Sequence, residues 1–143
     1  MLRHVNEDDL DTLFEQQRDP EAVAMAVFPA REREAFDAHW RKLLADDSNV
    51  VRVIEVDGEV VGNIGSWEHD GQQLVGYWLG REYWGRGLAT AALAELVQEL
   101  GTRPLHARVA MSNAGSIRVL EKCGFVRVGE RSTDLEEYLY ELV

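Results

Sequence analysis

Two glycines, Gly85 and Gly87, stand between a strand-like segment and a helix-like segment in the middle of the chain. The preceding segment, Leu74 to Leu79, carries the β-branched and aromatic residues that suit a pleated strand, and Ala89 to Leu100 has the apolar spacing of a helix. Glycine lets the backbone turn sharply, and the first N–H groups of a helix lack partners within it. The sequence therefore predicts a loop at a helix start that binds an anion such as phosphate.

Two familiar phosphate-binding patterns fit this loop poorly. A nucleotide P-loop requires Lys-Ser or Lys-Thr after its last glycine, whereas Leu88 and Ala89 follow Gly87. A dinucleotide fingerprint requires Gly or Ala at its last position, where this chain has Thr90, and no parallel βαβ unit surrounds the loop. A nucleotide-binding loop stays as a rival that predicts protection by ATP and none by coenzyme A.

The stretch Glu82-Tyr83-Trp84-Gly85-Arg86-Gly87 resembles the coenzyme A pyrophosphate loop of the GNAT N-acetyltransferase superfamily, Arg/Gln-x-x-Gly-x-Gly/Ala. It departs from that pattern at its first position, where Glu82 removes a side-chain donor. A second block, which begins Asn113-Ala114-Gly115-Ser116 and ends Cys123-Gly124-Phe125, resembles the branch that acetylates ribosomal-protein N-termini, the RimJ/RimL-like enzymes. The opening from Leu2 is similar to the first strand and helix of that branch, so the resemblance runs from about residue 2 to the end.

The predicted fold class is α+β, with a mixed, mostly antiparallel sheet and flanking helices, and the resemblance implies the GNAT acyl-CoA N-acyltransferase fold. The pairs Asp57-Gly58 and Asp70-Gly71 predict two hairpin turns, which join three strands into a meander that leads into the glycine loop. Helices are predicted at Asp8 to Arg18, from Pro20, and at Arg31 to Leu44, Ala89 to Leu100 and Ile117 to Lys122. Strands are predicted at Val50 to Val56, Val60 to Trp67, Leu74 to Leu79, Leu105 to Ala110, Phe125 to Val128 and Glu137 to Leu142.

Size, charge and cysteine content narrow the class of protein. The 143 residues, 45% of them apolar, suit a single domain over residues 1–143. The net charge of −11, from 26 acidic and 15 basic residues, argues against nucleic acid and fits either a cationic acceptor or an acidic surface that maintains solubility. We expect no membrane span or signal segment, a cytoplasmic location, no metal site among the scattered histidines and no intramolecular disulfide, since Cys123 is the only cysteine. A homodimer is left open.

The resemblance implies that acetyl-coenzyme A is the acetyl donor. Backbone amides from Gly85 to Thr90 are expected to hold its pyrophosphate, with Arg86 adding charge at the rim, while Asn113 and Ser116 face the pantetheine arm. That arm is expected to enter a split between the strand Leu74 to Leu79 and the strand Leu105 to Ala110. The expected cofactor-binding residues are Tyr77, Trp78, Leu79, Trp84, Gly85, Arg86, Gly87, Leu88, Ala89, Thr90, Asn113 and Ser116.

The catalytic candidates are Ser116, Glu68 and the backbone amide of Leu79. By resemblance, the Leu79 amide donates to the thioester oxygen, and Leu120 stands where many relatives carry a tyrosine as general acid. Ser116 is then the candidate that protonates the leaving thiolate, or else a cap of the helix start. Candidates for the general base are Glu68, with His69 and Glu136 as alternatives, or a water chain to solvent.

These features favour an N-acetyltransferase that transfers the acetyl group of acetyl-coenzyme A to a primary amine by direct attack in a ternary complex. A protein or peptide N-terminal α-amine leads the acceptors because of the branch resemblance, followed by a small amine such as a polyamine or aminoglycoside. A non-catalytic acyl-coenzyme A binding or regulatory module is the rival from another class.

Overall fold

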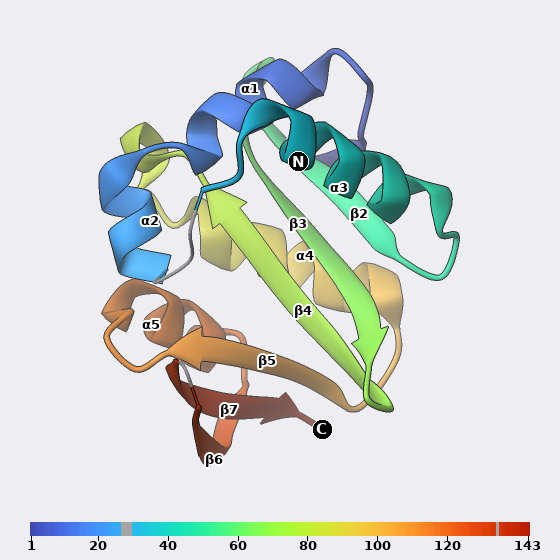
Figure 1. Ribbon diagram of the computed structural model, residues 1–143. Coiled ribbons are helices and arrows are strands. Elements are labelled where there is room, and N and C mark those ends of the chain that lie inside the picture. The colour runs from blue at the N-terminus through green and yellow to red at the C-terminus, as the bar shows by residue number, and fades with distance from the viewer. Residues whose placement is uncertain (27–29, 134) are drawn as a thin grey trace.

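The computed structural model describes residues 1–26, 30–133 and 135–143, which build one seven-stranded sheet in the order β1-β2-β3-β4-β5-β7-β6 (Figure 1). Neighbouring strands are antiparallel except β4 and β5, which are parallel, so the sheet is mixed as predicted. The strands are β1 (Leu2–His4), β2 (Val50–Val56), β3 (Glu59–His69), β4 (Gln72–Leu79), β5 (Leu105–Ala110), β6 (Val126–Ser132) and β7 (Glu136–Leu142). The helices are α1 (Asp9–Gln17), α2 (Pro20–Ala26), α3 (Arg33–Ala45), α4 (Leu88–Leu100) and α5 (Ala114–Lys122), with a 3-10 turn, η1, at Arg81–Tyr83.

Two tight turns fold β2, β3 and β4 into the predicted meander. Asp57 and Gly58 in the first turn, and Asp70 and Gly71 in the second, all have positive φ values between 50° and 79°. Positive φ at both central residues is typical of two-residue hairpin turns, and the Asp-Gly pairs adopt it readily. The meander fixes the position of β4, whose end enters the glycine loop through η1.

Helices cover the two faces of the sheet unequally. The far face in Figure 1 carries α4, and its core includes Ile64, Leu93, Leu96, Leu105 and Tyr140, each almost wholly inaccessible to solvent. The near face carries α1 and α3 over β2 and β3, with a second core of Leu13, Phe14, Phe36, Trp40 and Val53. The near face of β4 and β5 is therefore less covered than that of β2 and β3.

The parallel strands β4 and β5 are paired at one register position, Leu74 with His106. By contrast, β3 follows β4 over eight consecutive pairs, and β5 follows β7 over six. The two parallel strands therefore separate toward Leu79 and Ala110, which produces the predicted split in the sheet.

A buried carboxylate at the start of α1 ties this helix to the sheet. The oxygens of Asp9 accept hydrogen bonds from Nη1 and Nη2 of Arg3, both at 2.8 Å, and from the backbone N–H of Asn6 at 2.7 Å. The hydrogen bonds from Arg3 hold the pKa of Asp9 below its ordinary value, against the opposing effect of burial. Breaking this arrangement leaves the Arg3 guanidinium with Glu55 as its one acidic partner among the described residues.

We expect Asp9→Ala to lower the free energy of unfolding by about 2 kcal/mol at pH 7, because charged hydrogen bonds to a buried group are lost. The folded-state pKa of Asp9 is lowered, so its contribution is complete above the ordinary value of 3.8 and disappears as the pH falls from there through the lower pKa of the folded state. Urea unfolding of wild type and variant across this acid range measures both effects. Asp11→Ala, which removes an exposed acid of the same helix, is the control, and an equal loss in the two variants would contradict the assignment.

Candidate active site

The glycine loop leaves a row of backbone N–H groups without partners. Gly85 and Gly87 have φ values of +77° and +74°, and Gly87 is the N-cap of α4. The first helical hydrogen bond here runs from the N–H of Ala91 to the carbonyl of Gly87, at 3.1 Å. Over the described residues, none of the amides from Gly85 to Thr90 donates a hydrogen bond to the protein. Together with the dipole of α4, they form the kind of surface that binds an anion.

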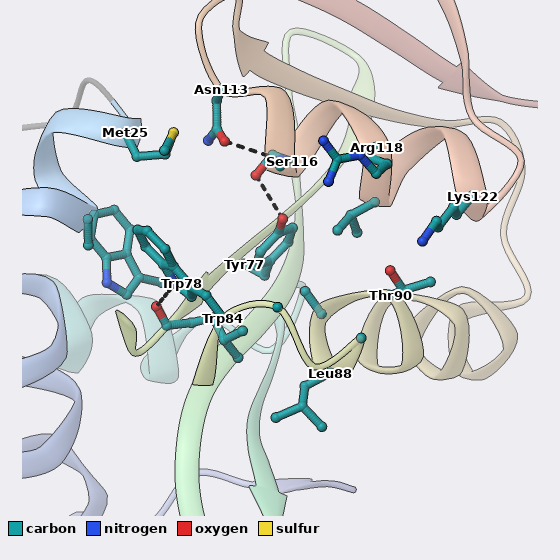
Figure 2. A pocket seen from close by; sticks show the side chains of 17 residues that line it. Met25, Tyr77, Trp78, Trp84, Leu88, Thr90, Asn113, Ser116, Arg118 and Lys122 are labelled. Atoms are coloured by element: carbon teal, nitrogen blue, oxygen red, sulfur yellow. Dashed lines mark hydrogen bonds between the residues drawn. The ribbon is translucent and has the colours of Figure 1, made fainter. Parts of the chain in front are cut away.

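A cavity of about 340 Å³ lies against this loop (Figure 2). Its walls come from the end of β4, the start of α4, the first turns of α5 and part of α2. Every cofactor residue predicted from the sequence lines it except Arg86. That side chain is exposed, donates from Nη2 to the carbonyl of Glu82 at 3.3 Å and lies over the ring of Tyr83. The lining residues predicted from the sequence are Tyr77, Trp78, Leu79, Trp84, Gly85, Gly87, Leu88, Ala89, Thr90, Asn113 and Ser116.

Sequence reasoning missed two basic residues of this cavity, Arg118 and Lys122 of α5. They are four residues apart, so they share one helix face, and Figure 2 shows Lys122 beside Thr90 at the start of α4 and Arg118 nearer to Ser116. The available signal was their spacing from Gly115 of the second block, because residues 115, 118, 119 and 122 follow the helical repeat and all line the cavity. The lining of this cavity contains no acidic residue among those described, although the whole chain is strongly acidic.

The backbone of β4 directs alternate N–H groups toward the split. The N–H of Gly80 donates to the carbonyl of Val61 at 2.8 Å, on the β3 side. Hydrogen-bonded pairs alternate in an antiparallel ladder, so the backbone of Leu79 points the other way, toward β5. Consistent with this direction, the Leu79 carbonyl accepts from Nε1 of Trp84 at 3.0 Å. The N–H of Leu79 thus faces the region where β4 and β5 have separated.

A hydroxyl pair joins β4 to α5 inside the cavity. Oη of Tyr77 and Oγ of Ser116 are 2.7 Å apart, and Oδ1 of Asn113 accepts from the backbone N–H of Ser116 at 3.2 Å (Figure 2). Asn113 is therefore the cap of α5, and the Ser116 hydroxyl is directed to Tyr77 instead of to the helix end. Burial raises the pKa of Tyr77, partly offset by the hydrogen bond with Ser116, so the phenol keeps its proton at neutral pH.

A second cavity of about 680 Å³ extends from the near side of the sheet, between α3 and strands β3, β4, β5 and β7, as far as Leu93 of α4 and Leu120 of α5. It meets the first cavity at Tyr77, Trp78, Asn113 and Ser116, which line both. The hydroxyl pair therefore stands at the junction, reachable by one molecule from the glycine loop and by another from the near face.

The candidates for a general base are distributed differently from the prediction. Glu68 and Glu136 are exposed and line neither cavity, while His69 lines the second cavity at its exposed end, with Nε2 3.3 Å from a carboxylate oxygen of Asp70. The carboxylate that does line it is Glu137, the neighbour of Glu136 on β7. Successive side chains of a strand point to opposite faces of the sheet, so Glu136 is exposed while Glu137 faces the cavity.

His39 of α3 also lines the second cavity, a position that the sequence did not single out. Burial, followed by the nearby charges of Arg31 and Lys42, lowers its pKa, so the imidazole is neutral at pH 7 and able to accept a proton. Leu120, at the place of the tyrosine in many relatives, is buried in the core and offers no polar group.

Some other features lie outside this arrangement. Cys123 lines neither cavity, its Sγ donates to the carbonyl of Thr90 at 3.5 Å, and burial raises the pKa of its thiol. Within the described residues, no three His, Cys, Asp or Glu side chains are gathered as metal ligands. In the same part of the chain, no helix has both the length and the apolar character needed to span a membrane.

Residues 1–126 match the protein family described as "Acetyltransferase (GNAT) domain". The chain belongs to the GNAT acetyltransferase family. This GNAT domain has the loop, the split sheet and the second block at the positions where the sequence resemblance placed them.

Relatives of this GNAT domain include two curated Bacillus proteins. The "Putative ribosomal N-acetyltransferase YdaF" of Bacillus subtilis is 30% identical over 107 residues, which cover 68% of this chain and 57% of that protein. The chain thus spans little more than half the length of YdaF. The "Uncharacterized N-acetyltransferase p20" of Bacillus licheniformis is 29% identical over 142 residues, which cover 90% of this chain and 79% of that protein.

The same fold occurs in the solved structure of the aminoglycoside acetyltransferase AAC(6')-Ib in complex with coenzyme A and kanamycin. The TM-score is 0.85 at 23% sequence identity, with 100% of this chain and 94% of that chain covered. At this identity the likeness concerns the fold.

Proposed function

We propose that residues 1–143 form a single N-acetyltransferase domain that transfers the acetyl group of acetyl-coenzyme A to a primary amine, with a protein or peptide N-terminal α-amine as the leading acceptor. The observation that carries this proposal is the meeting of two cavities at the Tyr77–Ser116 pair, one of them ending at unpartnered helix N–H groups. Donor and acceptor can thus bind from opposite sides and react directly, without an acyl-enzyme.

The donor side suits coenzyme A in charge and in shape. The amides from Gly85 to Thr90 bind the pyrophosphate, and Arg118 and Lys122 supply cations on the facing helix. The split between β4 and β5 admits the pantetheine arm, whose amides resemble a peptide. The relatives support this assignment, because two of them are named as N-acetyltransferases and a solved structure of the same fold holds coenzyme A.

The residues at the junction fit the steps of amine acetylation. The nitrogen lone pair of the neutral amine attacks the thioester carbon, and the N–H of Leu79 donates to the oxygen on which negative charge develops. The carbon–sulfur bond then breaks, and Ser116 gives its proton to the thiolate while Tyr77 replaces that proton through their hydrogen bond. Tyr77, which also lines the acceptor cavity, regains a proton from that side through water, so that it is neutral again for the next turnover. The proton lost by the attacking nitrogen goes to Glu137 or His39 on the acceptor side, directly or through water.

An α-amine is the easier nucleophile for a site of this kind. Its reference pKa is roughly 8, against roughly 10.4 for lysine, so deprotonation at about pH 7 costs about 1.4 kcal/mol for the first and about 4.6 kcal/mol for the second. The base candidates in the second cavity are one half-buried carboxylate and one imidazole, which favours the less costly acceptor. The name of YdaF, "Putative ribosomal N-acetyltransferase", supports a protein acceptor.

A small amine is the second candidate acceptor. The observation in its favour is the size of the second cavity, about 680 Å³, which is large enough to enclose a small molecule. The fold shared with an aminoglycoside acetyltransferase that was solved with coenzyme A and kanamycin supports this candidate.

Purified protein with acetyl-coenzyme A and a panel of peptides, polyamines and aminoglycosides tests the proposal. We expect release of free thiol together with a mass increase of one acetyl group on the acceptor, at the α-amine of the peptides. Tight coenzyme A binding without transfer to any amine would instead identify a non-catalytic acyl-coenzyme A binding module. Protection of the protein by ATP and not by coenzyme A would identify a nucleotide loop.

A further inference from the structure

We infer that the acceptor amine carries a carboxylate, which the guanidinium of Arg108 binds in the second cavity. This inference rests on the proposed function and refines its substrate class. It concerns the charges of the near-face cavity, which differ in sign from those of the chain as a whole.

The described residues that line the second cavity include two guanidinium groups and one carboxylate. Arg31 and Arg108 are the cations, Glu137 is the acid, and His39 and His69 are the remaining titratable side chains. The chain as a whole has 26 acids and 15 bases, so this lining reverses the overall balance. A polyamine or aminoglycoside, with several ammonium groups, would bring like charges toward both arginines. The cavity therefore favours an acceptor with a negative group.

Arg108 is the side chain best placed to take that group. It is half-buried on β5 and, within the described residues, forms no ion pair or side-chain hydrogen bond. Its direct neighbour across the sheet is Leu139, and the nearby Glu141 already contacts His106, with Oε2 3.0 Å from Nε2. A partly desolvated guanidinium without a counter-ion is a strong site for a carboxylate, which it can bind through two parallel hydrogen bonds.

The order of residues along β5 and β7 also orients the acceptor. Glu137 pairs with Ala110, at the end of β5 next to the junction, whereas Arg108 is two residues earlier on the same face. Two residues of a strand span about 7 Å. An acceptor whose amine points to the junction and Glu137 therefore reaches Arg108 with a carboxylate only a few bonds away. A free amino acid and a peptide with an acidic residue near its N-terminus both have this chemistry.

The test compares matched acceptors with and without the carboxylate. One arm uses a free amino acid and its carboxamide, and the other uses peptides that differ in Asp or Asn at the second position. Removing the carboxylate also changes the pKa of the amine, so the ratio of kcat/KM within each pair is compared between wild type and Arg108→Gln. In the variant we expect the ratio of kcat/KM for the acceptor with the carboxylate to that for the acceptor without it to fall about tenfold, mainly through a higher KM. The arm in which the ratio falls identifies whether the carboxylate belongs to a free amino acid or to an acidic residue of a peptide.

Arg41→Gln is the control, because it removes one positive charge from the exposed side of α3 without touching the cavity lining. Arg108→Lys, which keeps the charge but not the two parallel donors, should retain part of the preference. It also keeps the test open if the glutamine variant folds poorly. Calorimetric titration of the same acceptors into the complex with coenzyme A gives a second readout that needs no turnover.

The outcomes separate this inference from the proposed function. Carboxylate binding that depends on Arg108, without transfer to any amine, would support the inference and contradict the enzyme activity. Faster transfer to polyamines or aminoglycosides than to every carboxylate-bearing amine would overturn the inference and leave the activity standing. An unchanged ratio in Arg108→Gln, or no binding of the carboxylate acceptors, would also overturn it.

Discussion

Ser116→Ala is expected to lower kcat for acetyl transfer about 100-fold, because a positioned general acid contributes at least this much when the leaving group needs a proton. The dissociation constant of acetyl-coenzyme A should change little, since backbone amides and basic side chains hold the phosphates. Ser116 is not the cap of α5, so the helix should keep its stability. Steady-state kinetics, equilibrium binding and thermal unfolding of one preparation measure the three quantities.

Tyr77→Phe distinguishes a relay from two independent donors. If Tyr77 acts by reprotonating Ser116, the double variant should be no slower than Ser116→Ala alone, because the two hydroxyls work as a unit. Tyr140→Phe is the matched control, since it removes a buried phenol that donates to Glu121, away from both cavities. Ser112→Ala is the corresponding serine control. A kcat for Ser116→Ala equal to that of Ser112→Ala would show that the thiolate leaves without this proton.

Gly87→Val is expected to raise the dissociation constant of acetyl-coenzyme A at least tenfold, which corresponds to about 1.4 kcal/mol. A β-branched residue at a φ of +74° is strained by roughly 1–2 kcal/mol, so the loop turns its N–H groups away from the phosphate direction. An added Cβ meets no atom within 4 Å, so the effect comes from backbone geometry and not from a clash within the protein. Calorimetric titration measures it.

Gly101→Val is the matched control for this effect. Gly101 ends the same helix with a φ of +63° and likewise has no atom within 4 Å of an added Cβ, but it is far from the loop. Both variants should lose comparable stability, and only Gly87→Val should lose affinity. Arg86→Ala should have the smaller effect on binding, because its side chain does not line the cavity. Equal dissociation constants for Gly87→Val and Arg86→Ala would contradict the assignment of the amides.

The sequence predicted the fold well where local chemistry decides the backbone. The Asp-Gly turns and the two loop glycines all adopt positive φ values. The strand predicted at Phe125 to Val128 is less accurate, since β6 runs from Val126 to Ser132. Its last residues are polar, and pairing with β7 makes them a strand, with a register shift between Arg127 and Gly129. Such pairing is a long-range effect that alternation of residue types does not reveal.

The candidate site was predictable on the donor side and much less so on the acceptor side. The donor cavity is built mainly from two continuous stretches of the chain, residues 77–90 and 113–122, so sequence motifs describe it. The acceptor cavity draws single residues such as His39, Arg108 and Glu137 from three separate elements, and only the fold brings them together. The overall charge of −11 suggested a cationic acceptor, but a sum over the chain says nothing about which charges face a cavity.

The single register pair between β4 and β5 has a consequence for how ligand binding and stability are linked. Beyond Leu74 and His106, β4 and β5 form no further register pairs, so their facing backbone groups are open to hydrogen bonds from a peptide-like arm. A bound donor would then act as a short extra strand that completes the ladder between the N-terminal meander and the C-terminal hairpin. A donor bound in this way would be a part of the fold as well as a substrate.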